Sequence, residues 1–365
     1  MKILSSEDIR EADKYTIAQE PISSIDLMER AATACAVWIK EHLANDAHLV
    51  IFCGGGNNGG DGLALARLIL QETDMRVTTF LCAPEENLTP DTAENLKRLH
   101  HEFPANIHKL ERLEWLIPFV FDEHVVFIDA LFGTGLNRPI EGWIAELIKW
   151  LNGCLQPIIS IDMPSGLYTD DNAANDYKAV VRAAFTLTFQ TPKLAFMLAE
   201  NSAFVQAFQV LDIGLHPGYL QTVNTPYHFV TPADITTVYQ PRPKFGHKGD
   251  FGHVLVGAGS RGKIGAAVLS ATAALRAGAG LVTAYIPKCG YNILQTAQPQ
   301  AMVIESEQEN HLAGNVNTAS YDVFAMGPGI GLESDTQHLL KRIIQDTRVP
   351  LVLDADALNI LSENK

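Results

Sequence analysis

The stretch that decides the fold is HLVIFCGGGNNGGDGLALARLIL, residues 48–70. Its first six residues are almost all apolar, which predicts a buried strand over residues 48–53. A loop with six glycines follows, and LALARLIL at residues 63–70 has the composition of a buried helix. A strand, a glycine-rich loop and a helix in this order predict the first repeat of a parallel α/β sheet.

The same alternation extends over the first 216 residues. Two helices that begin at serine N-caps are predicted before the glycine loop, at residues 5–20 and 23–43. After the loop, runs that are apolar on both faces alternate with helical stretches; the predicted strands are 75–82, 124–130, 157–163, 183–189 and 208–214, and the predicted helices are 91–103 and 141–151. Such alternation is typical of a Rossmann-like, doubly wound and mainly parallel sheet.

A second domain is predicted after a change in composition and periodicity. Residues 216–249 are rich in Pro, Thr and Tyr and only weakly periodic, which indicates a junction. Strand and helix patterns alternate again from residue 252, so we place the domains at residues 1–216 and 217–365. Because the chain stops about one helical turn past a strand, we expect this second α/β domain to be incomplete.

Composition and charge exclude several classes of protein. The formal net charge is −15 and lysine and arginine form no stripe, which argues against a nucleic-acid partner. The five cysteines are widely spaced and form no C-x-x-C pair, so we expect a reducing compartment. The N-terminus lacks a signal-peptide core, and no apolar run is long enough to span a membrane. A cytoplasmic enzyme is the expectation.

The glycine loop resembles a dinucleotide fingerprint and departs from it. Gly54, Gly56 and Gly59 satisfy G-x-G-x-x-G between a strand and a helix, where a pyrophosphate binds in many proteins. The acid that should follow the next strand is missing, since Glu85 and Glu86 come too late.

Asp61 argues further against a phosphate. We predict this residue at the helix start, where a carboxylate would repel a phosphate and cap the helix. Two interpretations stay open: a tight turn with a capping Asp, and a ligand-binding wall made of backbone and of the Asn57 and Asn58 amides.

Two more loops begin at predicted strand ends. Asp129 ends one strand, and Asp162 and Ser165 follow another. Ligands bind at the carboxyl ends of the strands in open parallel sheets, so we expect these side chains to share one edge with Asn58. All are hard oxygen donors, and a metal at this edge should therefore be a hard cation.

These segments resemble a known family of repair enzymes. GGGNNGGDG (54–62), IDALFGTGLNRP (128–139) and IDMPSGL (161–167) are similar to signature segments of NAD(P)H-hydrate epimerase. HKGDFGHVLVGAGS (247–260), GAAVLSATAALRAGAGLV (265–282), MGPGIG (326–331) and LDADALNIL (353–361) resemble the ADP/ATP-dependent NAD(P)H-hydrate dehydratase, which has a ribokinase-like fold. The resemblance covers nearly the whole chain, and Met163 replaces the Val or Ile that is usual in the family.

The resemblance implies repair of NADH and NADPH whose nicotinamide ring has been hydrated. The epimerase interconverts the R and S hydrates, and the dehydratase removes water from the S form. Asp162 is the implied catalytic residue, with Lys193 as a weaker second, and Asn58, Asp129 and Ser165 would hold K⁺. The residues implied to bind the substrate are Asn57, Asn58, Gly59, Gly60, Asp61, Gly133, Thr134, Gly135, Leu136, Asn137, Arg138, Pro139 and Asp162.

The second half contains a near match to another motif. GAGSRGKI at residues 257–264 nearly fits a P-loop, but Ile264 replaces the hydroxyl that would ligate magnesium. The resemblance instead implies that Ala266 and Gly329 contact the hydrated substrate, with Asp356 and Asn359 nearby and with ADP or ATP and Mg²⁺ as cofactors. The family's catalytic Asp segment does not follow residue 361, so residues 1–365 are expected to lack dehydratase activity.

Other functions and partners stay open at this stage. The alternatives are an NAD-dependent oxidoreductase built on the first glycine loop, a ribokinase-type small-molecule kinase, and a non-catalytic nucleotide-binding module. A homo-oligomer is expected, with the two N-terminal helices as the surface that could face a partner subunit. His247, His253, His100 and His101 are interpreted as packing or surface residues.

Overall fold

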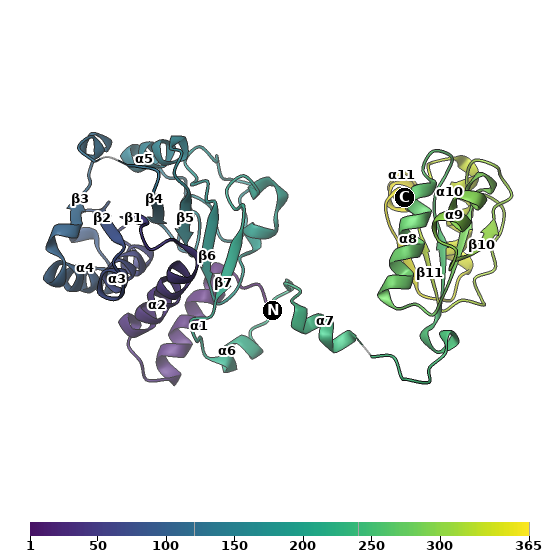
Figure 1. The fold of residues 1–365 in the computed structure, drawn as a ribbon, viewed down its shortest axis with the longest axis horizontal. Coiled ribbons are helices and arrows are strands. Elements are labelled where there is room, and N and C mark those ends of the chain that lie inside the picture. Colours follow the sequence, from purple (N-terminus) through teal and green to yellow (C-terminus); the bar gives the residue numbers. More distant parts are fainter. Residues whose placement is uncertain (120, 240, 365) are drawn as a thin grey trace. The chain divides into compact units, whose positions relative to one another are not determined.

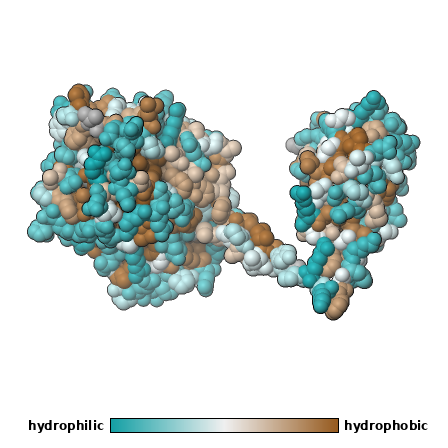
Figure 2. Space-filling model, viewed as in Figure 1, coloured by the Kyte–Doolittle hydropathy of each residue, from teal (hydrophilic) through white to brown (hydrophobic). Residues whose placement is uncertain are grey.

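The structure is a computed structural model that describes residues 1–119, 121–239 and 241–364. The chain forms two compact units, Met1–Val238 and Tyr239–Lys365 (Figure 1). Hydrophilic residues cover most of the visible face of each unit (Figure 2). Within the described ranges, no helix has both the length and the apolar character needed to cross a membrane.

The first unit is built on a seven-stranded sheet in which every pair of neighbours is parallel. Its strand order is β3-β2-β1-β4-β5-β6-β7, the order of a Rossmann-like sheet with one further edge strand. The strands are β1 (His48–Cys53), β2 (Arg76–Leu81), β3 (Ile107–Lys109), β4 (Val125–Ala130), β5 (Ile158–Ile161), β6 (Phe185–Phe189) and β7 (Phe208–Leu211). All but β3 were predicted, and β3 is too short to leave an apolar pattern.

Helices cover both faces of this sheet. One face packs against α2 (Ser24–His42), α3 (Asn57–Glu72) and α4 (Pro90–Glu102), and the other packs against α5 (Gly142–Gly153) (Figure 1). The predicted serine caps of the two N-terminal helices are confirmed: Ser5 begins α1 (Ser6–Gln19) and Ser23 begins α2, each with a capping box. The doubly wound α/β architecture is therefore confirmed.

The segment after β7 belongs to the first unit by its contacts. It carries α6 (Pro217–Thr222) and α7 (Pro232–Val238), and Tyr227 O accepts a hydrogen bond from Ile3 N at 3.0 Å. Lys2 also pairs with His228 in an isolated antiparallel bridge. The first compact unit ends at Val238, whereas the predicted boundary after residue 216 divides functional domains, and that boundary stays a prediction.

The second unit has a five-stranded parallel sheet with the order β10-β9-β8-β11-β12. Its strands are β8 (His253–Gly257), β9 (Leu281–Ile286), β10 (Met302–Glu305), β11 (Val323–Met326) and β12 (Leu351–Leu353). On one face lie α8 (Ile264–Ala277) and α9 (Tyr291–Ala297), and on the other lie α10 (Ser334–Asp346) and α11 (Asp356–Glu363). The predicted α/β alternation is confirmed, with α9 and β10 as elements that the sequence pattern did not indicate.

Candidate functional site

The first unit contains a cavity of about 700 Å³ at the carboxyl ends of its central strands. The loops after β1, β4, β5 and β6 form its base, and α1, α2 and residues 213–215 close it. The predicted site residues that line it are Asn57, Asn58, Asp61, Gly133, Thr134, Gly135, Leu136, Asn137, Arg138 and Asp162. Three loops that are distant in sequence therefore meet at one cavity, as the topology of a parallel sheet requires.

Three of the residues predicted to bind the substrate in this unit do not line the cavity. Gly59 and Gly60 lie in the first turn of α3, and Pro139 follows the loop residues that do line the cavity. A Cβ atom on Gly60 would lie 2.6 Å from Met28 Sδ, so Gly60 faces helix α2. The bare backbone of these two glycines serves packing between protein segments.

The same reason explains Gly54. A Cβ atom on Gly54 would lie 1.9 Å from Leu131 O, and one on Gly59 would lie 1.8 Å from Gly54 O. Real Cβ atoms do not approach a carbonyl oxygen so closely, so only glycine fits at either position. We expected the glycine loop to be bare so that a ligand could approach it. That explanation is wrong for these glycines and holds at most for Gly56, which lines the cavity.

Asp61 does not cap α3, which corrects the prediction from sequence. The helix begins at Asn57 with Gly56 as its N-cap, so Asp61 is its fifth residue. Its side chain is buried, lines the cavity and has a pKa raised well above its ordinary value, first by burial and then by repulsion from Asp162 and Asp13. The interpretation of this stretch as a tight turn with a capping Asp is excluded, and the wall of amides is supported.

Asp162 and Lys193, the two predicted catalytic residues, form a buried ion pair. Lys193 Nζ lies 3.1 Å from Asp162 Oδ1, and the Lys193 side chain is fully buried. Lys193 Nζ also donates to Phe189 O at 3.0 Å and to Thr191 O at 3.1 Å. The lysine lies behind the carboxylate and does not line the cavity. The Asp162 side chain therefore lies between the cavity, which it lines, and the buried Lys193 ammonium group.

The backbone aims Asp162 into the cavity. Asp162 has φ +62°, a left-handed conformation that Asp adopts more readily than most residues. Gln190, directly after the neighbouring strand β6, has φ +59°. Its Oε1 accepts hydrogen bonds from Ile213 N and Leu215 N, at 3.1 and 3.2 Å, and thereby holds another part of the cavity wall.

Asp13 lines the cavity and was missed by the sequence analysis. It lies on α1 and is partly buried, and its pKa is raised to about 7, first by burial and then by repulsion from Asp162. The signal that could have found it is an acid between Ile9 and Ile17, four residues away on either side, on the apolar face of a helix.

Below the cavity lies a cluster of hard oxygen atoms. Asp129 is fully buried and accepts hydrogen bonds from Ser165 Oγ at 2.6 Å, Ser160 Oγ at 2.7 Å and Ser165 N at 2.8 Å. Burial raises the pKa of this carboxyl group, and the hydrogen bonds act against that shift. Within the described residues no lysine or arginine forms an ion pair with it. The buried charge is therefore compensated by neutral donors alone.

Asn58 lies next to this cluster with its amide group unused. Neither Asn58 Oδ1 nor Nδ2 has a hydrogen-bond partner in the described part of the chain, although both are buried. A Cβ atom on Gly133 would lie 3.2 Å from Asn58 Cβ, and the preceding residue Phe132 donates its N–H to Ser165 Oγ at 2.8 Å. The loop after β4 thus connects Asn58 with Ser165 and Asp129, which were predicted to meet. Buried amides without partners are rare, and this one indicates an absent ligand.

The second unit brings its predicted residues together at the carboxyl ends of β8, β11 and β12. A Cβ atom on Gly329, which has φ +69°, would lie 2.9 Å from Ala266 Cβ. Asp356 Oδ2 accepts from Gly331 N at 2.8 Å and lies 3.7 Å from Lys263 Nζ. Asn359 Nδ2 donates to Asp356 Oδ1 at 3.4 Å.

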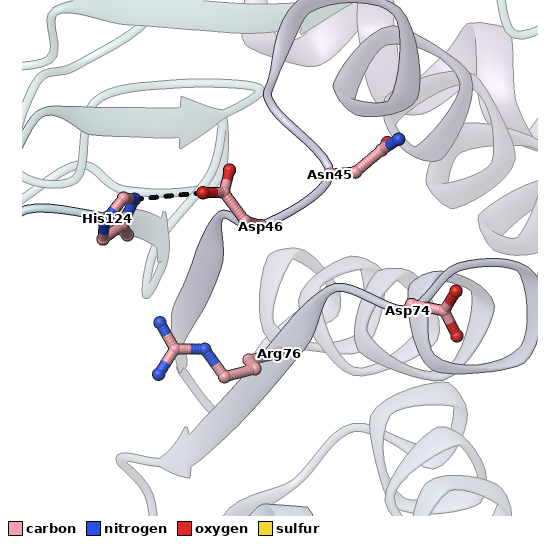
Figure 3. Close-up of a pocket in the computed structure, with 5 residues that line it drawn as sticks. All are labelled: Asn45, Asp46, Asp74, Arg76 and His124. Atoms are coloured by element: carbon pink, nitrogen blue, oxygen red, sulfur yellow. Dashed lines mark ion pairs between the residues drawn. The ribbon is translucent and has the colours of Figure 1, made fainter.

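Another depression of about 530 Å³ lies at the opposite edge of the first sheet. It is lined by Asn45, Asp46, Asp74, Arg76 and His124, which precede or begin β1, β2 and β4 (Figure 3). Asp46 Oδ2 pairs with His124 Nδ1 at 3.4 Å. These side chains are polar surface groups at the amino ends of the strands, where parallel sheets do not place their ligand sites.

The fold and the two sites define the general class of this protein. The protein is a two-unit α/β protein in which each parallel sheet carries a polar site at its carboxyl edge, and the first site holds a buried Asp–Lys pair. The sequence profile described as YjeF-related protein N-terminus matches residues 24–195, and the profile described as NAD(P)H-hydrate dehydratase matches residues 254–365. The chain belongs to the family of bifunctional NAD(P)H-hydrate repair enzymes.

One relative of known name supports this assignment, and two solved structures resemble parts of the chain. The bifunctional NAD(P)H-hydrate repair enzyme of Moorella thermoacetica is 32% identical over 99% of this chain and 70% of its own length. A crystal structure of a yeast protein matches 57% of this chain and 88% of that chain, with 22% identity and a TM-score of 0.46. The ADP/ATP-dependent NAD(P)H-hydrate dehydratase from Bacillus subtilis, crystallised with ATP and Mg²⁺, matches 35% of this chain and 46% of that chain, with 24% identity and a TM-score of 0.30.

Proposed function

We propose that the first unit interconverts the R and S forms of hydrated NADH and NADPH. The observation that carries the proposal is the cavity of about 700 Å³, in which the Asp162 carboxylate meets an amide-lined wall. A cavity of this size suits a nucleotide-sized ligand. Epimerisation at a ring carbon that bears a hydroxyl group requires proton transfer to and from oxygen, and Asp162 is the residue proposed to handle that proton.

The residues proposed to bind the substrate follow from the lining of the cavity. Asn57, Asn58 and Asp61 form one wall, and residues 133–138 form another, with Arg138 as the cation available to a pyrophosphate. Gly59 and Gly60 support these walls from outside the cavity, and Pro139 directly follows the lining residues. Lys193 is proposed to act through Asp162, as the residue that holds the carboxylate in position.

Potassium is proposed to bind at the oxygen cluster of Asn58, Asp129 and Ser165. The residues present fit a large hard cation: Asn58 Oδ1 is buried without a partner, and Asp129 is a buried carboxylate without a cationic neighbour in the described residues. A bound cation supplies positive charge below the cavity. The side chains themselves anchor the loop after β4, whose residues line the substrate site.

We propose that the second unit carries part of the site for the dehydratase half of the repair reaction. Ala266 and Gly329 are proposed to contact the S hydrate, beside Asp356 and Asn359. ADP or ATP with Mg²⁺ is proposed as the cofactor, in keeping with the family profile over residues 254–365.

The test is the separation of the two hydrate epimers by chromatography, with and without the protein, first in potassium and then in sodium. The purified R form should reach the equilibrium mixture faster with protein, and faster in potassium than in sodium. An unchanged rate of epimer conversion in both salts would refute the proposed epimerase function. A rate that is equal in both salts would refute only the potassium site.

Asn58 offers a sharper test of that site. We expect Asn58→Ala to raise the potassium concentration that gives half of the maximal rate by about tenfold or more, since the variant loses a ligand oxygen. Asn87→Ala, on the exposed loop after β2, is the control and should leave this concentration unchanged.

A further inference from the structure

Helix α1 contributes two charged residues to the cavity, Arg10 and Asp13. They lie three residues apart and so share one face of the helix. The family profile begins at residue 24, so α1 lies outside the matched region. None of the motifs that indicated the site includes this helix. The resemblance therefore assigns no role to these two side chains, although both line the cavity.

Asp13 and Asp162 face the same cavity in opposite electrostatic settings. Asp162 is paired with Lys193 at 3.1 Å. In the described chain Asp13 has neither a salt bridge nor a side-chain hydrogen bond, and it is partly buried among the apolar side chains of Ile9 and Ile17. Burial and the Asp162 charge raise its pKa to about 7, against a smaller opposite effect of Lys193.

The remaining charges around the cavity do not change this contrast. Arg10 is exposed at the mouth on the same helix, and Arg138 lies in the loop after β4. Asp91 on α4 adds another acid to the lining, and burial raises the pKa of Asp61 on α3 well above its ordinary value. Four acids line the cavity with two arginines, and one lysine is buried behind Asp162, so the acids outnumber the cations and burial favours a protonated carboxyl group. Two carboxyl groups whose settings differ in this way are a common arrangement for an acid and a base.

We propose that Asp13 is a second catalytic residue of the epimerase, the general acid that protonates the hydroxyl group of the hydrated ring while Asp162 acts as the base. The inference rests on the proposed epimerase function and assigns a separate residue to the other half of the proton transfer.

The proposed epimerisation proceeds through loss and return of water at the ring carbon. The Asp13 carboxyl group gives its proton to the ring hydroxyl, the C–O bond breaks, and water leaves with the bonding pair. The lone pair of the ring nitrogen forms the C=N bond of an iminium ion. Water then adds to the opposite face of that carbon, the C=N pair returns to nitrogen, and Asp162 takes the released proton. Proton exchange with solvent restores Asp162 as carboxylate and Asp13 as acid.

The first experiment compares Asp13→Asn with the unaltered protein. General acids contribute about 10²- to 10⁴-fold, so we expect the maximal epimerisation rate to fall by at least about 100-fold. The substrate dissociation constant should change by less than about threefold, because Asn keeps the size and polarity of the side chain. Glu11→Gln, an exposed acid on the same helix, removes the same charge and should keep the full rate.

The pH profile separates a catalytic acid from a structural residue. The rate of the unaltered protein should fall as the pH rises through about 7, because the acid must be protonated to act. Asp13→Asn should lack this fall, and Asp13→Glu should restore both the fall and part of the rate.

The outcomes distinguish the two proposals. An unaltered protein that does not epimerise the hydrate refutes the proposed function itself. An active protein in which Asp13→Asn keeps both the rate and the alkaline fall refutes the role of Asp13 alone. An Asp13→Asn protein that loses both its activity and its native tryptophan fluorescence has failed to fold, and Asp13→Glu then tests the role of the residue. Full loss of activity in a folded Asp13→Glu protein also overturns the assignment.

Discussion

Each unit places an Asp–Lys pair at the carboxyl edge of its sheet, and the two pairs differ in burial. Lys193 and Asp162 lie 3.1 Å apart, with side chains 0% and 11% exposed. Lys263 and Asp356 lie 3.7 Å apart, with side chains 57% and 20% exposed. Water screens the second pair and hardly reaches the first. Two pairs of the same residue types therefore differ in electrostatic strength, because only the first is shielded from water.

The largest expected effect comes from Asp162→Asn. The variant removes the proton acceptor and keeps the shape of the side chain, so epimerisation should fall by about 10²- to 10⁴-fold while ligand binding is largely retained. Chromatography of the purified R form measures the rate, and Glu200→Gln, an exposed acid in the same unit, is the control. Normal turnover of the R form by Asp162→Asn would contradict the assignment of the base.

Lys193→Met tests the stability side of the comparison. It leaves the Asp162 carboxylate without its cation, and breaking a buried pair in this way costs about 3 kcal/mol or more of unfolding free energy. The four tryptophans, Trp38, Trp115, Trp143 and Trp150, all lie in the first unit, so their fluorescence in a urea titration reports on that unit. Lys178→Met breaks an exposed pair with Asp176 and should change the free energy by less than about 0.5 kcal/mol.

Asp13→Asn should stabilise the first unit at alkaline pH although it damages activity. A pKa raised from 3.8 to about 7 means that the folded state binds this proton more tightly than the unfolded state. Ionising Asp13 in the folded state therefore costs free energy of folding; this cost is absent below pH 3.8 and grows as the pH rises toward 7. The variant should therefore gain about 1 to 3 kcal/mol over the unaltered protein at pH 8, and less at pH 5. An equal gain at both pH values would show that the carboxyl group is not perturbed.

Lys263→Met should have the smallest effect. An exposed pair contributes at most about 1 kcal/mol, and Asp356 keeps its hydrogen bond from Gly331 N. Hydrogen exchange of peptides from β9 and β11 measures the stability of the second unit, which has no tryptophan of its own. A loss comparable to that of Lys193→Met would end the distinction between the two pairs.

The sequence predicted the base of the first site better than its roof. Asp129, Asp162 and Ser165 follow apolar strands, and the rule that parallel strands end at one edge is sufficient to bring them together. Asp13 could not be placed in this way, because α1 reaches the cavity only through tertiary packing.

The start of α3 was misplaced for a different reason. Gly59, Gly60 and Gly62 have low helix propensity, so the helix was expected to begin after them. Tertiary packing overrides that propensity: these glycines lie where α3 approaches Gly54, Met28 and Ala130 too closely for a side chain. Asp61 thereby moved from a capping position into the wall of the cavity.

The left-handed residues Asp162 and Gln190 have a practical consequence for protein engineering. They follow neighbouring strands, each as the first residue beyond its own strand, and both adopt a conformation that most side chains avoid. A designer who copied only the side chains onto another Rossmann-like scaffold would aim the carboxylate elsewhere. A successful graft would have to reproduce the left-handed backbone at both positions, together with Lys193, which donates hydrogen bonds to Phe189 O and Thr191 O on either side of Gln190.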